Sequence, residues 1–106
     1  MSAQFILIVE ADRAAARVIE AILKAEHYGT VLARCGEEAL SLMERRAPFL
    51  VLSEVVLPRM DGLTLLKKAK TRWPEVPFII LTAIREMSVI VRAMRAGAAN
   101  CLAKPF

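Results

Sequence analysis

The sequence has few of the features that mark membrane, secreted or metal-stapled proteins. Its apolar runs are short, because charged residues or proline interrupt each one well before the roughly 18 residues of a membrane helix. FILIV near the start has no basic segment before it and no small-residue cleavage site after it. Cys35 and Cys101 are too few and too far apart for a metal site or a disulfide framework. We therefore expect a cytoplasmic protein without a membrane segment.

Positive charge is too thinly spread for a nucleic-acid surface. The formal net charge is +4, aromatic residues make up 6% of the chain, and one tight basic cluster consists of Lys67, Lys68, Lys70 and Arg72. A surface that binds DNA or RNA concentrates more Lys and Arg on one face and adds aromatics that stack on bases. We expect no direct nucleic-acid contact by this domain.

The 106 residues, of which 57% are hydrophobic, suffice for one domain whose sheet is buried on both faces. Short apolar runs alternate with segments of helical spacing along the chain. The expected strands span 4–9, 30–34, 49–53, 76–81 and 100–103. The expected helices span 13–26, 37–46, 61–72 and 86–96. This alternation indicates a parallel sheet with right-handed crossovers and helices on both faces.

The spacing of apolar residues predicts which side of the first and last helices faces the sheet. Asp12 would cap the first helix and Gly29 would end it. Its inward stripe would consist of Ala15, Val18, Ile19, Ile22 and Leu23. The last helix would turn Val89, Val91 and Ala93 inward, expose Ile90 and Met94, and end at Gly97.

Polar residues stand where the expected strands end. Glu10 and Asp12 follow the first strand, Glu54 the third, Thr82 the fourth and Lys104 the fifth. In open parallel sheets, sites form at the carboxyl ends of strands near the point where the strand order reverses. We expect these side chains to converge on one site.

The segments FILIVEADR, LVLSEVVLPRMDG, FIILTA and GAANCLAKPF together resemble the response-regulator receiver domain of two-component signalling. The resemblance covers residues 1–106 and implies a flavodoxin-like, doubly wound sheet of five strands in the order 2-1-3-4-5. The family has one further helix, which this chain lacks. Its absence would leave the fifth strand and one sheet face without cover. Either the chain is part of a longer regulator, or a partner or second copy covers this surface.

The resemblance also implies roles for the polar residues. In the family an acidic pair after the first strand binds a divalent cation, and an aspartate after the third strand accepts a phosphoryl group. Here the pair reads Glu10-Ala11, and the acceptor position holds Glu54. Thr82 would contact the phosphoryl oxygen, and Lys104 would pair with the acceptor carboxylate and that phosphoryl group. A cis peptide bond between Lys104 and Pro105 would aim the lysine.

These departures weaken the expected chemistry. Magnesium takes near-octahedral oxygen ligands that usually include one or two carboxylates, and Ala11 removes the one that touches the cation directly in the family. Glu10 and Asp12 remain, but Asp12 should turn away to cap its helix, so we expect weak Mg²⁺ binding and no other cofactor. Glu54 carries its carboxylate one methylene further out, and a misplacement of about 1 Å can slow a reaction on the order of a hundredfold. A direct salt bridge to Lys104 would offset its charge.

The sequence thus predicts an atypical receiver, or pseudo-receiver, that acts through protein–protein contacts largely independent of phosphorylation. In the family an aromatic residue three positions before the lysine couples to the threonine; Cys101 stands there, so this coupling should be weak. The expected partners are a histidine kinase or an output domain. A homodimer through residues 86–103 is a further expectation, with Ile90 and Met94 on the contact surface.

Two alternatives need weighing. In one, Glu54 still accepts phosphate while Glu10 and Asp12 hold a weakly bound cation. The other is a phosphatase similar to the haloacid-dehalogenase enzymes, which use an aspartate nucleophile, an acid two residues later, and a downstream threonine and lysine. Glu10 is the wrong nucleophile for that reaction and no later acid pair is present. We therefore expect no enzymatic activity.

Overall fold

Alternating side chains of the first strand divide the core between the two faces of a sheet. In the computed structural model, which describes residues 4–104, β1 (Phe5–Val9) is buried along its whole length. Leu7 and Val9 belong to one apolar cluster, and Ile6 and Ile8 belong to another. Because successive side chains of a strand point to opposite faces, β1 is packed on both sides.

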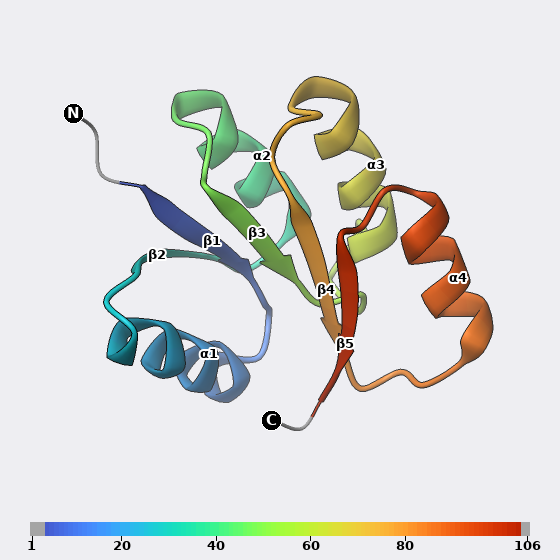
Figure 1. Cartoon of the computed structure of the whole chain (residues 1–106), viewed down its shortest axis with the longest axis horizontal. Coiled ribbons are helices and arrows are strands. Elements are labelled where there is room, and N and C mark those ends of the chain that lie inside the picture. Colours follow the sequence, from blue (N-terminus) through green and yellow to red (C-terminus); the bar gives the residue numbers. More distant parts are fainter. Residues whose placement is uncertain (1–3, 105–106) are drawn as a thin grey trace.

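Five parallel strands form one sheet in the order β2-β1-β3-β4-β5 (Figure 1). The other strands are β2 (Gly29–Ala33), β3 (Leu50–Ser53), β4 (Phe78–Thr82) and β5 (Asn100–Ala103). The order and the parallel pairing confirm the expected doubly wound, flavodoxin-like sheet. After β2 the chain returns past β1 to β3, so the direction of winding reverses between β1 and β3. The carboxyl ends of these strands lie toward the lower edge in Figure 1.

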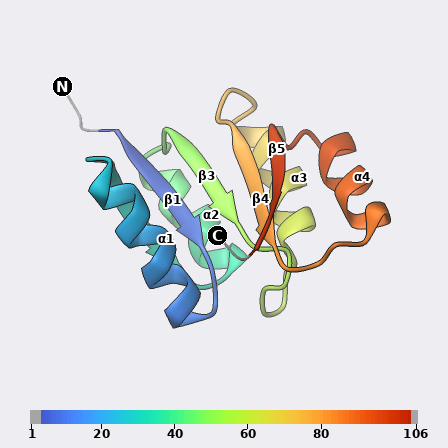
Figure 2. The ribbon, with the colours of Figure 1, turned by 60° about the horizontal axis from the view of Figure 1, so that its bottom comes forward.

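The helices are distributed unequally over the two faces. They are α1 (Arg13–Ala25), α2 (Gly36–Arg45), α3 (Gly62–Arg72) and α4 (Met87–Arg95). The larger apolar cluster includes Met43 of α2, Leu66 of α3 and Ala93 of α4, whereas Ile19 of α1 belongs to the smaller one. Figures 1 and 2 show α1 on the face opposite α2 and α3. Within residues 4–104, none of the helices combines the length and apolar character needed to cross a membrane.

The buried stripe of α1 is narrower than its apolar spacing predicts. Ile19 is buried, and so is Ala16, which the spacing does not single out. Val18 and Ile22 are 49% and 47% exposed, so the predicted stripe is wrong at these two positions. No other described helix shares this face, and an apolar groove of about 380 Å³ lies beside α1. The groove is lined by Ile19, Ile22, Leu23, Leu52, Leu81, Leu102 and Ala103.

The first helix ends in a Schellman motif rather than at Gly29. His27 has a φ of 68°, in the left-handed region that glycine usually occupies at such ends. Its N–H donates to the carbonyl of Lys24 at 2.9 Å, and the N–H of Tyr28 donates to the carbonyl of Leu23 at 3.0 Å. These two bonds satisfy carbonyls at the helix end, and Gly29 instead begins β2.

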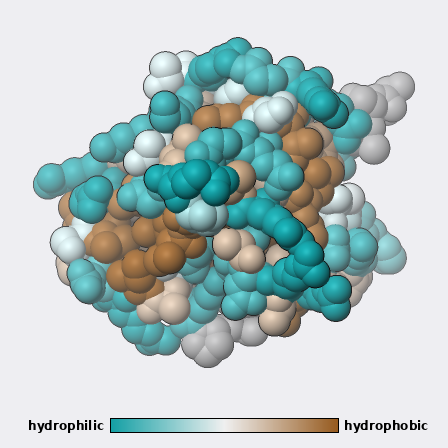
Figure 3. All heavy atoms as spheres, turned by 180° about the vertical axis from the view of Figure 1, so that it is seen from behind, coloured by the Kyte–Doolittle hydropathy of each residue, from teal (hydrophilic) through white to brown (hydrophobic). Residues whose placement is uncertain are grey.

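The outer side of α4 carries more apolar surface than its spacing predicts. Ala93 is buried as expected, but Val91 is 37% exposed and Ile90 is half-buried, which corrects the expected placement of both. Met87 and Met94 are also exposed. Residues 87, 91 and 94 follow one another at helical spacing and so lie along one side. In the view from behind, a hydrophobic patch lies on the left, the side of α4 (Figure 3).

Gly62, the first residue of α3, packs against the loop that carries Glu54. A Cβ there would lie 2.1 Å from the backbone carbonyl oxygen of Glu54, whereas a Cβ at Gly36 would meet the movable end of Met60 at 2.7 Å. We expect Gly62→Ala to lower the free energy of unfolding by about 2 kcal/mol or more, because backbone must shift. Gly36→Ala should cost less than about 1 kcal/mol. Urea denaturation measures both, and equal losses would contradict this account.

Candidate functional site

Main-chain hydrogen bonds between neighbouring strands hold the polar residues at one edge of the sheet. The N–H of Glu10 donates to the last carbonyl of β2 at 3.0 Å, and the N–H of Glu54 donates to the last carbonyl of β1 at 3.1 Å. The N–H of Lys104 donates to the carbonyl of Thr82 at 2.9 Å. These bonds extend the ladders by one residue. They bring Glu10, Glu54, Thr82 and Lys104 to the carboxyl ends of the strands, as predicted.

The ammonium group of Lys104 joins the two carboxylates of this edge. Its Nζ lies 2.9 Å from Oε2 of Glu54 and also donates a hydrogen bond to Oε1 of Glu10. The side chains of Glu10 and Glu54 are only 5% and 8% exposed, and that of Lys104 is 18% exposed. The expected salt bridge between Glu54 and Lys104 is therefore present, and it includes Glu10 as well.

The second carboxylate oxygen of Glu54 is bonded to its own loop. Oε1 accepts the N–H of Val55 at 2.7 Å and that of Val56 at 3.3 Å. Burial by itself would raise the pKa of Glu54, but hydrogen bonds from Thr82, Lys104 and the Val55 amide outweigh it and hold the pKa below 4.5. The carboxylate is thus ionised at neutral pH, and both of its oxygens have partners.

Asp12 points away from this cluster, as the sequence predicts. Its Oδ1 accepts the N–H groups of Ala14 and Ala15 at 2.9 and 3.3 Å, which caps α1. Only its backbone meets the cluster, through an N–H that donates to Oε2 of Glu10 at 3.3 Å. The Asp12 carboxylate is therefore committed to the helix.

These donors do not fit a divalent cation. Glu10 and Glu54 both bind Lys104, Asp12 caps α1, and Ala11 carries no ligand. In the part of the chain that the structure describes, no group of three or more His, Cys, Asp or Glu side chains is arranged to hold a metal ion. Magnesium needs several oxygen ligands in near-octahedral positions, and it would have to displace the lysine to gain its carboxylates.

Thr82 and Cys101 complete the surroundings of Glu54. Thr82 is buried, and its Oγ1 accepts the N–H of Ile84 at 3.1 Å. Cys101 is half-buried on β5, where burial and then the negative charge of Glu54 raise the pKa of its thiol. Ile90 and Met94 belong to α4 and lie outside this cluster. Pro105, and with it the expected cis bond, lies outside the described residues.

The sequence reasoning missed the two amides that hold Glu54. Val55 and Val56 act through their backbone N–H groups, so their side chains carry no signal of the contact. It also missed the arginines beside Glu10, because Arg13 and Arg17 lie on α1 whereas Arg34 follows β2, a separate segment. Only the path of the chain brings these groups to the site.

The pKa of Glu54 makes stability depend on pH. A carboxyl whose pKa is lower in the folded state stabilises the fold above its unfolded pKa, and the contribution is lost as the pH falls through the folded pKa. Burial by itself would lower the pKa of Lys104, but its bonds to Glu10 and Glu54 outweigh burial and raise the pKa. The stability that Lys104 contributes is therefore lost only in alkali, as the pH rises above 10.5. The contribution of Glu54 is thus lost in acid, far from the alkaline range in which that of Lys104 is lost.

We expect Glu54→Gln to flatten the loss of unfolding free energy between about pH 5 and pH 3 relative to the wild type. Glu75→Gln, which removes an exposed carboxylate, should leave that slope nearly unchanged. Urea denaturation at a series of pH values measures the slope. An acid slope in Glu54→Gln as steep as in the wild type would show that Glu54 is not held ionised.

Comparison with known proteins gives the family. Residues 6–106 match the family model described as the response regulator receiver domain. The chain is 40% identical over 101 residues to the response regulator protein FleR of Pseudomonas aeruginosa. The aligned region covers 95% of this chain and 21% of FleR. It is 36% identical over 101 residues to the response regulator MprA of Mycobacterium sp. (strain KMS), covering 95% of this chain and 44% of that protein. The chain thus spans less than half the length of these relatives.

Solved structures share the fold. A putative response regulator from Chloroflexus aurantiacus is similar with a TM-score of 0.93 and 34% identity, covering 99% of this chain and 88% of that one. A CheY-like receiver domain protein from Methanospirillum hungatei has a TM-score of 0.92 and 32% identity, covering 99% and 84%. Sheet order, site position and the family match agree, and the chain belongs to the response regulator receiver domain family of two-component signalling.

Proposed function

We propose that this receiver domain acts as a pseudo-receiver, which signals through protein contacts largely without being phosphorylated. The observation that carries the proposal is the ammonium group of Lys104, bonded to both Glu10 and Glu54. Two buried carboxylates would repel each other in a site that excludes water. Lysine offsets one of the two charges, so the site reaches about one negative charge without a metal ion.

Cation binding would compete with these bonds. A magnesium ion keeps several waters and takes one or two carboxylates, and Glu10 and Glu54 are free for it only if Lys104 moves away. The ion would then have to offset both the lost salt bridges and its own dehydration. Ala11 supplies no replacement ligand. This competition supports weak Mg²⁺ binding and a function that needs no cofactor.

Glu54 is also poorly placed as a phosphate acceptor. One oxygen is bonded to Lys104 and the other to two backbone amides, and these hydrogen bonds stabilise the carboxylate charge and so weaken it as a nucleophile for phosphorus. Its extra methylene moves the carboxylate by about 1 Å, enough to slow transfer on the order of a hundredfold. A fixed charge of about −1 remains, where a phosphate group would carry about −1.5 to −2.

The alternative is a receiver in which Glu54 does accept phosphate, with Glu10 and Asp12 holding a weakly bound cation. Membership of the receiver family and the placement of Glu54 after β3 favour it. The two candidates differ in a covalent product, an acyl phosphate on Glu54. One experiment therefore separates them.

Incubation with Mg²⁺ and acetyl phosphate should add no phosphoryl group to the wild-type chain, as read by intact mass. We expect the double variant A11D/E54D to gain one, since it supplies the missing cation ligand and the shorter acceptor. E54Q is the control for modification at other residues. A mass gain in the wild type that disappears in E54Q would establish the alternative and refute the pseudo-receiver.

The proposed partners are a histidine kinase or an output domain, and the proposed contact region is residues 86–103. The relatives FleR and MprA are named response regulators, and the chain spans less than half of each. Met87, Val91 and Met94 expose an apolar side of α4. A half-exposed helix face of this kind suits a partner helix or a second copy of this chain.

If the chain forms a homodimer, Met94→Glu should weaken it at least about tenfold, because a charge would be buried at an apolar contact. Val18→Glu is the matched control, since Val18 is a similarly exposed apolar residue on α1. Sedimentation velocity over a concentration series measures the dissociation constant. Loss of the dimer in Val18→Glu alone would move the contact to the α1 face, and a wild type that stays monomeric would exclude the homodimer.

A further inference from the structure

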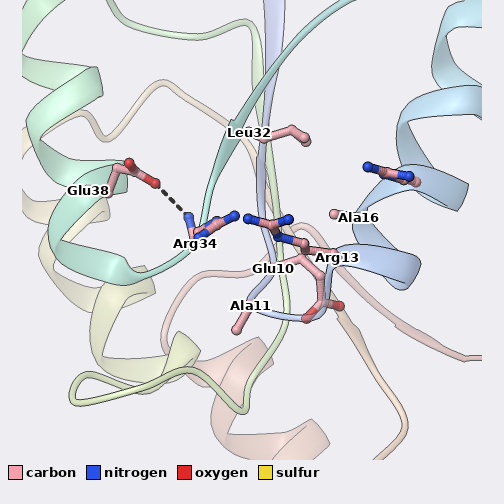
Figure 4. A pocket seen from close by; sticks show the side chains of 8 residues that line it. Glu10, Ala11, Arg13, Ala16, Leu32, Arg34 and Glu38 are labelled. Atoms are coloured by element: carbon pink, nitrogen blue, oxygen red, sulfur yellow. Dashed lines mark hydrogen bonds between the residues drawn. The ribbon is translucent and has the colours of Figure 1, made fainter.

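A second polar cavity lies beside the carboxylate cluster, between the start of α1 and the end of β2. Its volume is about 290 Å³. The lining residues are Glu10, Ala11, Arg13, Ala16, Arg17, Leu32, Arg34 and Glu38. Figure 4 shows the side chains of Arg13 and Arg34 reaching toward each other across the space between α1 and β2. The cavity thus carries three arginines and two glutamates, and it borders the Glu54 site through Glu10.

The carboxylates of this cavity already have other partners. Glu38 accepts the backbone N–H of Arg34 at 2.7 Å, the dashed line in Figure 4, and Glu10 binds Lys104. Within residues 4–104, no salt bridge or side-chain hydrogen bond involves the guanidinium groups of Arg13, Arg17 or Arg34. Three exposed guanidinium groups and two carboxylates therefore line one cavity, and the arginines outnumber the glutamates.

Other exposed arginines of this chain form salt bridges with glutamates. Arg59 pairs with Glu37 at 3.4 Å, and Arg72 pairs with Glu44. Arg13, Arg17 and Arg34 differ from these because they line one cavity together. Like charges around one cavity destabilise the chain that carries them, and an anion would turn that repulsion into attraction.

Two further features favour an anion here. Asp12 caps α1, but the first turn of the helix contains no acidic residue, and Arg13 begins the helix, where the helix dipole disfavours a positive side chain by about 0.3–1 kcal/mol. Ala11 places a methyl group at the cavity wall, so no carboxylate at that position repels an incoming anion. A bound anion would offset the unfavourable position of Arg13 at the helix N-terminus, and the methyl group of Ala11 leaves room for it.

We propose that this cavity binds a phosphate group through Arg13, Arg17 and Arg34, beside the Glu54 cluster and without contact to Glu54 itself. Guanidinium groups present paired N–H donors whose spacing matches two oxygens of a phosphate. Leu32 and Ala16 add apolar wall, which leaves room for the organic part of a phosphate monoester. The site needs neither phosphorylation nor a cation, so it stands whether or not the pseudo-receiver proposal holds.

Titration with inorganic phosphate and with phenyl phosphate, followed by amide chemical shifts, tests the proposal. We expect saturable shifts confined to residues 11–17 and 32–38 at near-physiological salt. Phenol alone should cause none. Equal affinity for both probes would show that the phosphate group alone is recognised, whereas tighter binding of phenyl phosphate would show that an ester on an organic carrier is the better ligand.

Charge-matched variants locate the binding. Arg34→Gln and Arg13→Gln should each weaken phosphate binding by about tenfold or more, since each removes hydrogen bonds to a charged group. Arg95→Gln removes the same charge on α4 and should leave the affinity within about twofold. Phosphate should also raise the Tm of the wild type but not that of Arg34→Gln.

Three results would overturn the site. Shifts centred on Glu54 and Thr82 would place the phosphate in the carboxylate cluster. An equal loss in Arg95→Gln and Arg34→Gln would show general attraction to a basic protein. No saturable shift with either probe would show that the arginines are ordinary solvated side chains. All three arginines are exposed, so the variants should fold, and circular dichroism of each confirms it.

Discussion

The bonds of Lys104 to Glu10 and Glu54 join the end of β5 to the ends of β1 and β3, which are not its neighbours in the sheet. The lysine follows β5, and its two partners follow β1 and β3, so one ammonium group connects the last strand to the point where the winding reverses. Removing one partner of a buried ion pair typically costs about 3–5 kcal/mol, because the remaining charge is left unpaired. The two buried carboxylates of this edge therefore depend on one cation for their counter-charge.

That arrangement has a consequence for signalling. A ligand or a modification shifts a conformational equilibrium only if it interacts differently with the two states. Here the lysine and the acceptor carboxylate are already joined, and Cys101 offers little surface that could move between a buried and an exposed position. Under the proposed function, information would be carried by the shape and charge of the surface, chiefly the exposed side of α4, rather than by a phosphate-driven change.

Sequence reasoning succeeded where structure follows from local rules and failed where packing decides. The strands and helices fall within two residues of the expected ranges, and β4 begins at Phe78 because Pro77 has no N–H for the ladder. The end of α1 was misplaced because His27 adopts the left-handed conformation usually left to glycine. Val18 and Val91 were expected to be buried, but the sheet beneath each helix reaches only part of its apolar side.

The amino-acid sequence by itself determined the order of strands and helices, the two buried faces of β1 and the polar residues that end each strand. Periods of two and of about 3.6 residues are properties of neighbouring residues, so they can be read along the chain. Only the tertiary structure decided that one lysine reaches two carboxylates, and that Arg13 and Arg34 share a cavity. Such meetings depend on how distant segments pack, and no local pattern records the distance between them.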